Sequence, residues 1–162
     1  MRTIGLDQSY NHNAIVSLNE HGELDGFTLA VKQPNLDVYD NAKYIAECVQ
    51  LAVEDMKPDI LAIEGLSFGG RGNQTRDLAG LQFVIITHLR SIDFKSIKIV
   101  APQTLKKFAT GSGRATKEDM IAKLPETVIE TFKRHGYKKT TGLSDLSDAY
   151  WLARYVQEYV DK

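Results

Sequence analysis

The chain has 162 residues, of which 43% are hydrophobic and 25% charged, and its net charge is −1. This composition is ordinary for a globular protein, and the length suits one domain over residues 1–162. No apolar run approaches the roughly 20 residues of a membrane span. No signal peptide is visible, and the single cysteine, Cys48, excludes an internal disulfide, so we expect a cytoplasmic protein.

The first half of the chain predicts four strands and one helix. Apolar alternation over Thr3–Asn19 indicates a β-hairpin, and a third strand follows at Leu24–Val31. A helical period covers Asp40–Met56, whose first residue is the expected N-cap. The apolar run Ile60–Ile63, ended by a glutamate, indicates a strand that is buried on both faces.

The second half predicts helices around one further strand. A glycine-rich loop, Leu66–Gln74, precedes a strongly apolar helix over Asp77–Ile92, which is a candidate subunit interface. A short strand is expected at Ile97–Ala101, and a helix that begins at Pro102 ends near Gly111. The remaining helices are expected at Lys117–Leu124 with Thr116 as cap, from Pro125 to about His135, and after Ser144 as cap.

Four carboxylates stand out by their places in this pattern. The helix between the third and fourth strands allows the fourth to lie parallel beside the first, which brings their terminal acids, Asp7 and Glu64, together. Asp145 and Asp148 are three residues apart at the start of the last helix, so they share a face. Each acid also has an ordinary explanation as a turn former or helix cap.

A cluster of such acids predicts a metal site. A charge beside a buried strand is costly unless it is paired or metal-bound, and clustered carboxylates repel one another until a cation binds. Carboxylate oxygens select hard ions, here Mg²⁺ or Mn²⁺, rather than zinc. Two such ions bridged by one acid stabilise the attacking and leaving oxygens in phosphodiester hydrolysis.

Positive charge is concentrated in one segment. Residues 98–139 contain ten Lys and Arg against four Asp and Glu, a balance of +6 that leaves −7 for the rest of the chain. This asymmetry suits a protein that holds phosphates with one surface and cations with another, although ordinary lysine decoration of a helical face is an alternative. His12, His21 and His88 lack metal-ligand spacing and are interpreted as structural or exposed.

Three short motifs resemble a known family. They are G-L-D-Q-S at Gly5–Ser9, A-I-E at Ala62–Glu64 and S-D-L-S-D-A at Ser144–Ala149. Their order, with the elements between them, resembles that of RuvC-type Holliday-junction resolvases over nearly the whole chain, as a divergent, phage-like member. Gln8 after Asp7 and the glycine-rich loop depart from the common pattern.

The resemblance implies a ribonuclease-H-like α/β fold. It implies a five-stranded mixed sheet in the order 3-2-1-4-5, with strand 2 antiparallel and helices on both faces. It also implies a homodimer that resolves branched DNA in recombination and repair, in a bacterial or phage-infected cell. Asp7, Glu64, Asp145 and Asp148 correspond to the family's catalytic and metal-binding acids, which hold two Mg²⁺ ions that Mn²⁺ can replace.

Further residues are candidates for DNA binding. Phe68, an aromatic in the glycine-rich loop, can stack on a base, and Lys106 and Lys117 match the family's two functional lysines. The full set of candidates is Phe68, Arg71, Arg76, Lys106, Lys107, Arg114 and Lys117.

The sequence therefore predicts a crossover junction endodeoxyribonuclease. Two other functions stay open: a structure-selective nuclease for flaps, forks or replication intermediates, and a non-catalytic DNA-binding module in which the acids are caps. A phosphotransfer domain of the actin and sugar-kinase type shares the strand order, but it needs a second lobe and a glycine-rich first hairpin. This chain is too short for two lobes and has Tyr10-Asn11-His12-Asn13 in that hairpin.

Overall fold

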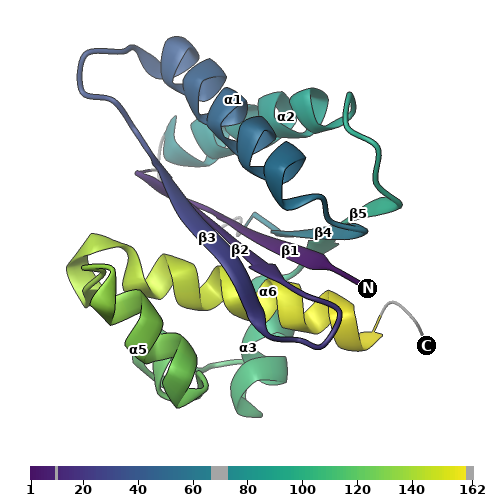
Figure 1. The fold of residues 1–162 in the computed structure, drawn as a ribbon. Helices are drawn as coiled ribbons and strands as arrows, with labels where there is room; N and C mark the ends of the chain where they lie inside the picture. Colours follow the sequence, from purple (N-terminus) through teal and green to yellow (C-terminus); the bar gives the residue numbers. More distant parts are fainter. Residues whose placement is uncertain (10, 67–72, 160–162) are drawn as a thin grey trace.

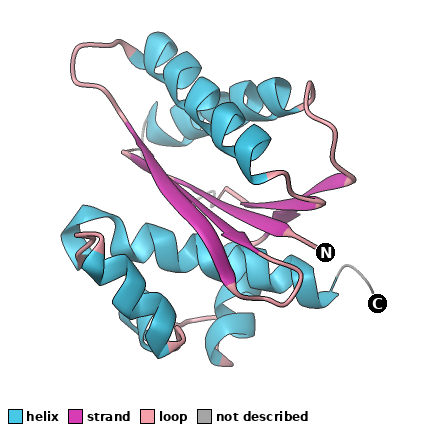
Figure 2. Cartoon of the chain, in the orientation of Figure 1, coloured by secondary structure: helices cyan, strands magenta, loops and turns pink. Residues whose placement is uncertain are grey.

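A computed structural model describes residues 1–9, 11–66 and 73–159. Its centre is a five-stranded sheet in the order β3-β2-β1-β4-β5, with helices on both faces (Figures 1 and 2). β2 is antiparallel to both of its neighbours, whereas β1, β4 and β5 are parallel, so the predicted topology is confirmed. The strands are β1 (Thr3–Gln8), β2 (His12–Leu18), β3 (Leu24–Val31), β4 (Ile60–Glu64) and β5 (Ser96–Val100).

Two helices cover one face of the sheet. α1 (Val38–Met56) and α2 (Asn73–Leu89) lie together above the strands in Figure 1. The layer between these helices and the sheet is an apolar core that includes Ile4, Leu61 and Ile85. Because β4 is buried along its whole apolar run, the prediction of a central strand is confirmed.

The other face is covered by the C-terminal half of the chain. α6 (Ser144–Tyr159) runs beneath β1, β2 and β4, and shorter helices pack around it (Figure 1). Phe132 and Leu146 are fully buried in the core between this layer and the sheet. The shorter helices are α3 (Pro102–Thr110), α4 (Lys117–Ala122) and α5 (Glu126–Arg134), and a wide turn, Lys139–Leu143, leads into α6.

Several predicted boundaries are wrong by a few residues. α1 is capped by Asp37, whose side chain accepts from the backbone N–H groups of Tyr39 and Asp40, so Asp40 lies in the first turn instead. α2 begins at Asn73, four residues before the predicted start. Its first turn is polar, so it carries no apolar period that the sequence could reveal. Ser144 itself has helical backbone angles, φ −66° and ψ −38°, so it is the first residue of the last helix and not the residue before it.

Other helix ends agree with the sequence. Thr116 caps α4 by a reciprocal pair of hydrogen bonds with Asp119. Gly111 ends α3 with φ +85°, a left-handed conformation that favours glycine. None of the helices in the described part of the chain is both long enough and apolar enough to cross a bilayer.

Candidate active site

Asp7 lies near the end of β1 and is 4% exposed. Side chains alternate along a strand, so Asp7 shares a face with Thr3 and Gly5. Thr3 marks this as the α6 face, because its hydroxyl donates to the carbonyl of Ala153 at 3.0 Å. The first predicted acid therefore points into the layer between the sheet and α6.

Glu64 ends the neighbouring parallel strand. The register pairs Leu6 with Ile63, so the next residues along the two strands, Asp7 and Glu64, lie side by side at the C-terminal end of the sheet. Their side chains are hydrogen-bonded to each other. The predicted meeting of these two acids is therefore confirmed.

Gly5 brings α6 into close contact with β1. A Cβ built on Gly5 would lie 1.9 Å from the carbonyl oxygen of Ala149, which no real side chain could tolerate. β1 and α6 run in opposite directions here, because Thr3 contacts Ala153 and Gly5 contacts Ala149. Asp7 lies two residues beyond Gly5 on β1, and Asp145 lies one turn before Ala149 on α6. This packing therefore brings the two acids close together.

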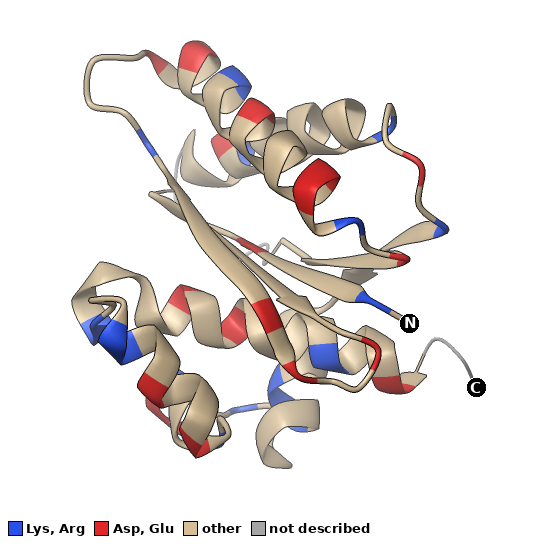
Figure 3. Ribbon diagram, in the orientation of Figure 1, with Lys and Arg blue, Asp and Glu red and all other residues tan. Residues whose placement is uncertain are grey.

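The turn before α6 sets where that helix begins. Gly142 has φ +113°, and a Cβ at this position would lie 2.6 Å from Cδ1 of Leu29 on β3. Both facts require glycine. α6 consequently starts directly beneath the sheet, and Figure 3 shows acidic bands (red) in its N-terminal half.

All four acids line one open cavity of about 340 Å³. Lys106 of α3 and Lys117, the first residue of α4, line the same cavity, so acids and bases from five elements converge there. The complete lining consists of Asp7, Gln8, Ser9, Glu64, Gly65, Leu66, Leu78, Pro102, Lys106, Lys117, Met120, Asp145 and Asp148.

Asp7, Glu64 and Asp148 are held in an environment that opposes their ionisation. Burial is the main cause that raises the pKa of Asp7, and the negative charges of its three carboxylate neighbours add to it. Burial and the charge of Glu64 raise the pKa of Asp148 to about 7, against the opposing charge of Lys117. Burial also raises the pKa of Glu64, although a hydrogen bond with Asp7 and the two lysine charges oppose it.

This donor set fits hard divalent cations. Buried carboxylates that repel one another gain most from a cation, which supplies the charge that burial denies them. Among the residues that the structure describes, no three acidic, His or Cys side chains are already gathered around a common point as metal ligands. The four carboxylates that line this cavity are the ones that would hold such an ion.

The other predicted basic residues lie outside the described lining of this cavity. Lys107 and Arg114 are exposed on and after α3, on the same side of the sheet. Arg76 is exposed on α2 and forms an ion pair with Asp77 at 3.2 Å. It lines a groove between α1 and α2 instead. Phe68 and Arg71 lie outside the described residues.

Three contacts at the site were not predicted from the sequence. His12 Nδ1 lies 3.4 Å from Asp145 Oδ2, so the interpretation of His12 as merely structural or exposed overlooks a contact with a site acid. Gln8 donates from Nε2 to the carbonyl of Leu78 at 2.6 Å, and Gln82 donates to the carbonyl of Glu64 at 3.3 Å. α2 is thereby tied to both strands that carry site acids.

Comparison with known proteins gives one related sequence and a group of related folds. No family model matches the chain. The crossover junction endodeoxyribonuclease RuvC of Cytophaga hutchinsonii is 32% identical over 111 residues, which are 67% of this chain. The match covers 50% of that protein, so the chain spans about half the length of the curated relative it matches.

Solved resolvase structures share the fold at low sequence identity. RuvC of Thermus thermophilus in complex with a Holliday junction superimposes with a TM-score of 0.76 at 15% identity, covering 99% of this chain and 95% of that one. The yeast mitochondrial Holliday junction resolvase gives a TM-score of 0.67 at 11% identity, covering 96% and 77% of the two chains. The predicted ribonuclease-H-like fold is thus confirmed.

Proposed function

We propose that this chain, which is RuvC-like in sequence and fold, is a metal-dependent endonuclease that resolves four-way DNA junctions by phosphodiester hydrolysis. The observation that carries the proposal is the convergence of four carboxylates and two lysines in one open cavity. The bacterial RuvC relative supports a cytoplasmic site of action, in a bacterial or phage-infected cell.

The acids would hold two divalent ions, Mg²⁺ or, in its place, Mn²⁺. Asp7 would be central to holding them, because Glu64 is beside it on the adjacent strand and the charges of both α6 acids act on it. Glu64, Asp145 and Asp148 would complete the coordination. Bound ions supply the Lewis acidity that activates water and stabilises the leaving 3′-oxygen. The buried position of Asp7 excludes bulk water and so strengthens every charge interaction at this point.

The lysines of the cavity would hold the phosphates that flank the scissile bond. Lys106 and Lys117 already act on the acids, since their charges lower the pKa of Glu64 and Asp148. Lys117 is also close enough to these acids to screen developing negative charge during the reaction. Lys107 and Arg114 would contact the DNA backbone further out, because exposed cations suit phosphates, whereas Arg76 lines the groove between α1 and α2. Arg71 is assigned to the backbone and Phe68 to base stacking at the branch point.

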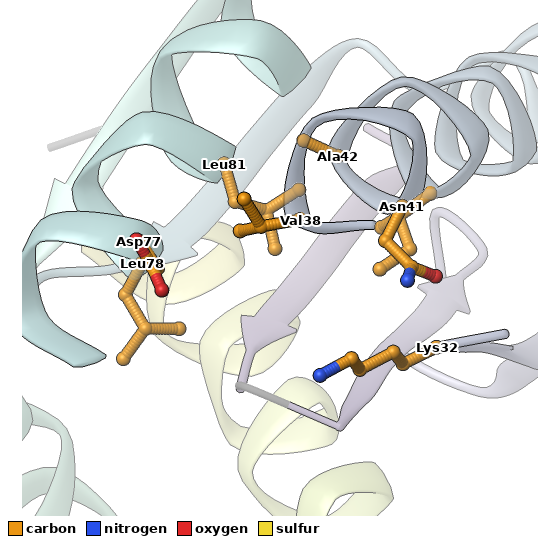
Figure 4. Close-up of a pocket in the computed structure, with 8 residues that line it drawn as sticks. Lys32, Val38, Asn41, Ala42, Asp77, Leu78 and Leu81 are labelled. Carbon is orange, nitrogen blue, oxygen red and sulfur yellow. The ribbon is translucent and has the colours of Figure 1, made fainter. Parts of the chain in front are cut away.

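Two copies of the chain would act together, because cutting both strands symmetrically needs two paired sites. The surface that supports a homodimer is the groove between α1 and α2. A groove of about 440 Å³ there exposes apolar side chains, and Phe83 on the outer face of α2 is 77% exposed. Figure 4 shows Val38 and Leu81 lying together between the two helices, in a smaller cavity of about 30 Å³.

The substrate is tested by gel-resolved cleavage of three DNAs with Mg²⁺: a four-way junction, a flap and a linear duplex. We expect paired cuts in opposite strands of the junction and little cleavage of the duplex. Faster cleavage of the flap would favour the structure-selective nuclease. Junction binding without cleavage of any DNA would favour the non-catalytic binding module. The Asp7→Asn variant, purified in parallel, controls for contaminating nucleases.

A further inference from the structure

We propose that His12 is a positioning residue for Asp145: its imidazole contacts Oδ2 of that carboxylate through Nδ1 and so fixes how Asp145 faces a metal ion. The inference rests on the proposed function, because it assigns Asp145 to the metal centre. It adds a residue outside the four acids, and it rests on a contact of 3.4 Å between Nδ1 and Oδ2.

Strand alternation brings His12 to the correct face of the sheet. Ala14 pairs with Asp7 across β1 and β2, and it belongs to the core against α6. His12 lies two residues before Ala14 on the same strand, so its side chain projects from the α6 face as well. On this face of the sheet, the side chain of His12 is therefore the β2 neighbour of the Asp7–Ala14 pair.

The backbone of His12 is fixed by Ser9. The Ser9 N–H donates to the carbonyl of His12 at 3.1 Å, and the His12 N–H donates to Ser9 Oγ at 3.0 Å. The Ser9 hydroxyl also donates to the carbonyl of His12. Ser9 itself lines the acidic cavity. These bonds close the hairpin and fix the backbone from which the imidazole projects toward Asp145.

The burial of the two partners gives the contact its strength. The Asp145 side chain is 9% exposed and that of His12 is 32% exposed, so the carboxylate is largely removed from water while the ring covers its outer side. Hydrogen bonds to the outer side of a metal-binding carboxylate orient it, and removing such a partner weakens metal affinity about 10- to 100-fold. Asp145 itself lines the acidic cavity, so its orientation bears directly on how it would hold an ion there.

The test measures Mn²⁺ binding by the full chain without DNA, by calorimetry and by electron paramagnetic resonance. Three substitutions separate the role of Nδ1 from the mere bulk of the ring. His12→Ala removes the contact, His12→Asn places an amide N–H near the position of Nδ1, and His12→Gln places it near Nε2. His21→Ala is the matched control, because His21 lies beside Glu20 at 3.7 Å in the turn at the other end of β2.

We expect His12→Ala to weaken the affinity for Mn²⁺ about 10-fold or more. His12→Asn should restore most of that loss, His12→Gln should restore less, and His21→Ala should bind as the wild type does. Thermal unfolding of the metal-free variants should stay close to that of the wild type. Equal weakening by all three His12 substitutions would overturn the inference, because a general packing defect would then explain the loss.

The Asp7→Asn variant separates this inference from the proposed metal centre. If Asp7→Asn weakens Mn²⁺ binding but His12→Ala does not, the metal centre stands and the role of His12 is overturned. If the wild type binds no Mn²⁺, or if Asp7→Asn leaves binding unchanged, the proposed metal centre fails and the His12 inference fails with it.

Discussion

At the scale of single residues, the site concentrates negative charge where water is scarce. Asp7 is 4% exposed, and its charged neighbours all lie within the same cavity. Such an arrangement is unfavourable for the metal-free protein, because burial and repulsion both penalise ionisation. The proposed metal centre would account for this arrangement, because a bound cation offsets both penalties.

The pKa of Asp148 predicts how the stability of the metal-free protein depends on pH. Its folded-state pKa of about 7 lies above the unfolded value near 4, so the native state binds more protons between these values. Stability from this group is therefore present at low pH and lost as pH rises from about 4 to 7. Asp148→Asn should remove that loss and stabilise the metal-free protein at pH 8 by roughly 1–3 kcal/mol.

Urea unfolding of both proteins in EDTA, between pH 5 and pH 8, measures this difference. The difference in unfolding free energy should grow with pH, and saturating Mg²⁺ should stabilise the wild type more than the variant. A difference that is constant over this range would mean that Asp148 ionises normally in the folded protein.

The two cavity lysines predict a defined loss of DNA binding. Lys106→Ala together with Lys117→Ala should weaken junction binding about 10-fold at moderate salt, and should reduce the slope of log K against log salt by about 1–2. Fluorescence anisotropy with a labelled junction in Ca²⁺ measures both quantities. Lys133→Ala, on the outer helix α5, is the control and should bind as the wild type does. An unchanged salt slope in the double variant would remove these lysines from the interface.

At the scale of elements, the closeness of β1 and α6 builds the site. Gly5→Ala would place a methyl group 1.9 Å from the backbone carbonyl oxygen of Ala149, and neither backbone can move aside without opening the core. We expect destabilisation of about 3 kcal/mol or more in denaturant unfolding.

Gly113→Ala is the matched control for this substitution. Its added Cβ meets its nearest atom, the carbonyl oxygen of Gln103, at 3.4 Å, so its stability should stay within about 1 kcal/mol of the wild type. If Gly5→Ala were as stable as Gly113→Ala, α6 could not lie against β1 as described.

The elements also show which parts of the site the sequence could predict. Asp7 and Glu64 lie at the ends of strands with clear apolar patterns. The rules for connecting strands leave few possible strand orders, so the meeting of the two acids was predictable. Asp145 and Asp148 share a face by helical spacing alone. These inferences depend on local periodicity and topology, both of which a sequence records.

Other features depend on packing that leaves no periodic trace. The contact of His12 with Asp145 requires both the Ser9 hydrogen bonds and the position of α6, and neither has a pattern of its own. The first turn of α2 is polar, so its helical start was invisible. Asp37 and Asp40 are equally good caps by type, and only the hydrogen bonds of Asp37 decide between them.

At the scale of the whole molecule, one layer carries the proposed dimer surface and the other completes the site. α2 joins the two functions, because Gln8 and Gln82 link it to the ends of β1 and β4. The outer face of α2 is therefore separated from the acids only by the width of α2 itself. A second copy docked on α1 and α2 would lie on the face of the sheet opposite α6, the helix that carries Asp145 and Asp148 (Figure 1).

The dimer is tested by Phe83→Glu. This substitution places a charge on a side chain that is 77% exposed beside the apolar groove, so it should dissociate a dimer without unfolding the monomer. Leu51→Glu is the matched control on α1: Leu51 is 66% exposed but lies two turns beyond Lys43, the last α1 residue of the groove, whereas Phe83 is next to Val84, which lines it. Analytical ultracentrifugation should give dimers for the wild type and Leu51→Glu, and monomers for Phe83→Glu. A wild type that is monomeric at all concentrations would contradict the dimer.

The central claim is that the acids around Asp7 are the catalytic centre of a metal-dependent junction nuclease. Its most direct test is the single-turnover rate of four-way junction cleavage against Mg²⁺ concentration, for the wild type and Asp7→Asn. The wild-type rate should rise with Mg²⁺, saturate, and vanish in EDTA. Asp7→Asn should bind the junction in Ca²⁺ as tightly as the wild type but cleave it at least about 10³-fold more slowly. Cleavage by Asp7→Asn at the wild-type rate, or wild-type cleavage that persists in EDTA, would contradict the account.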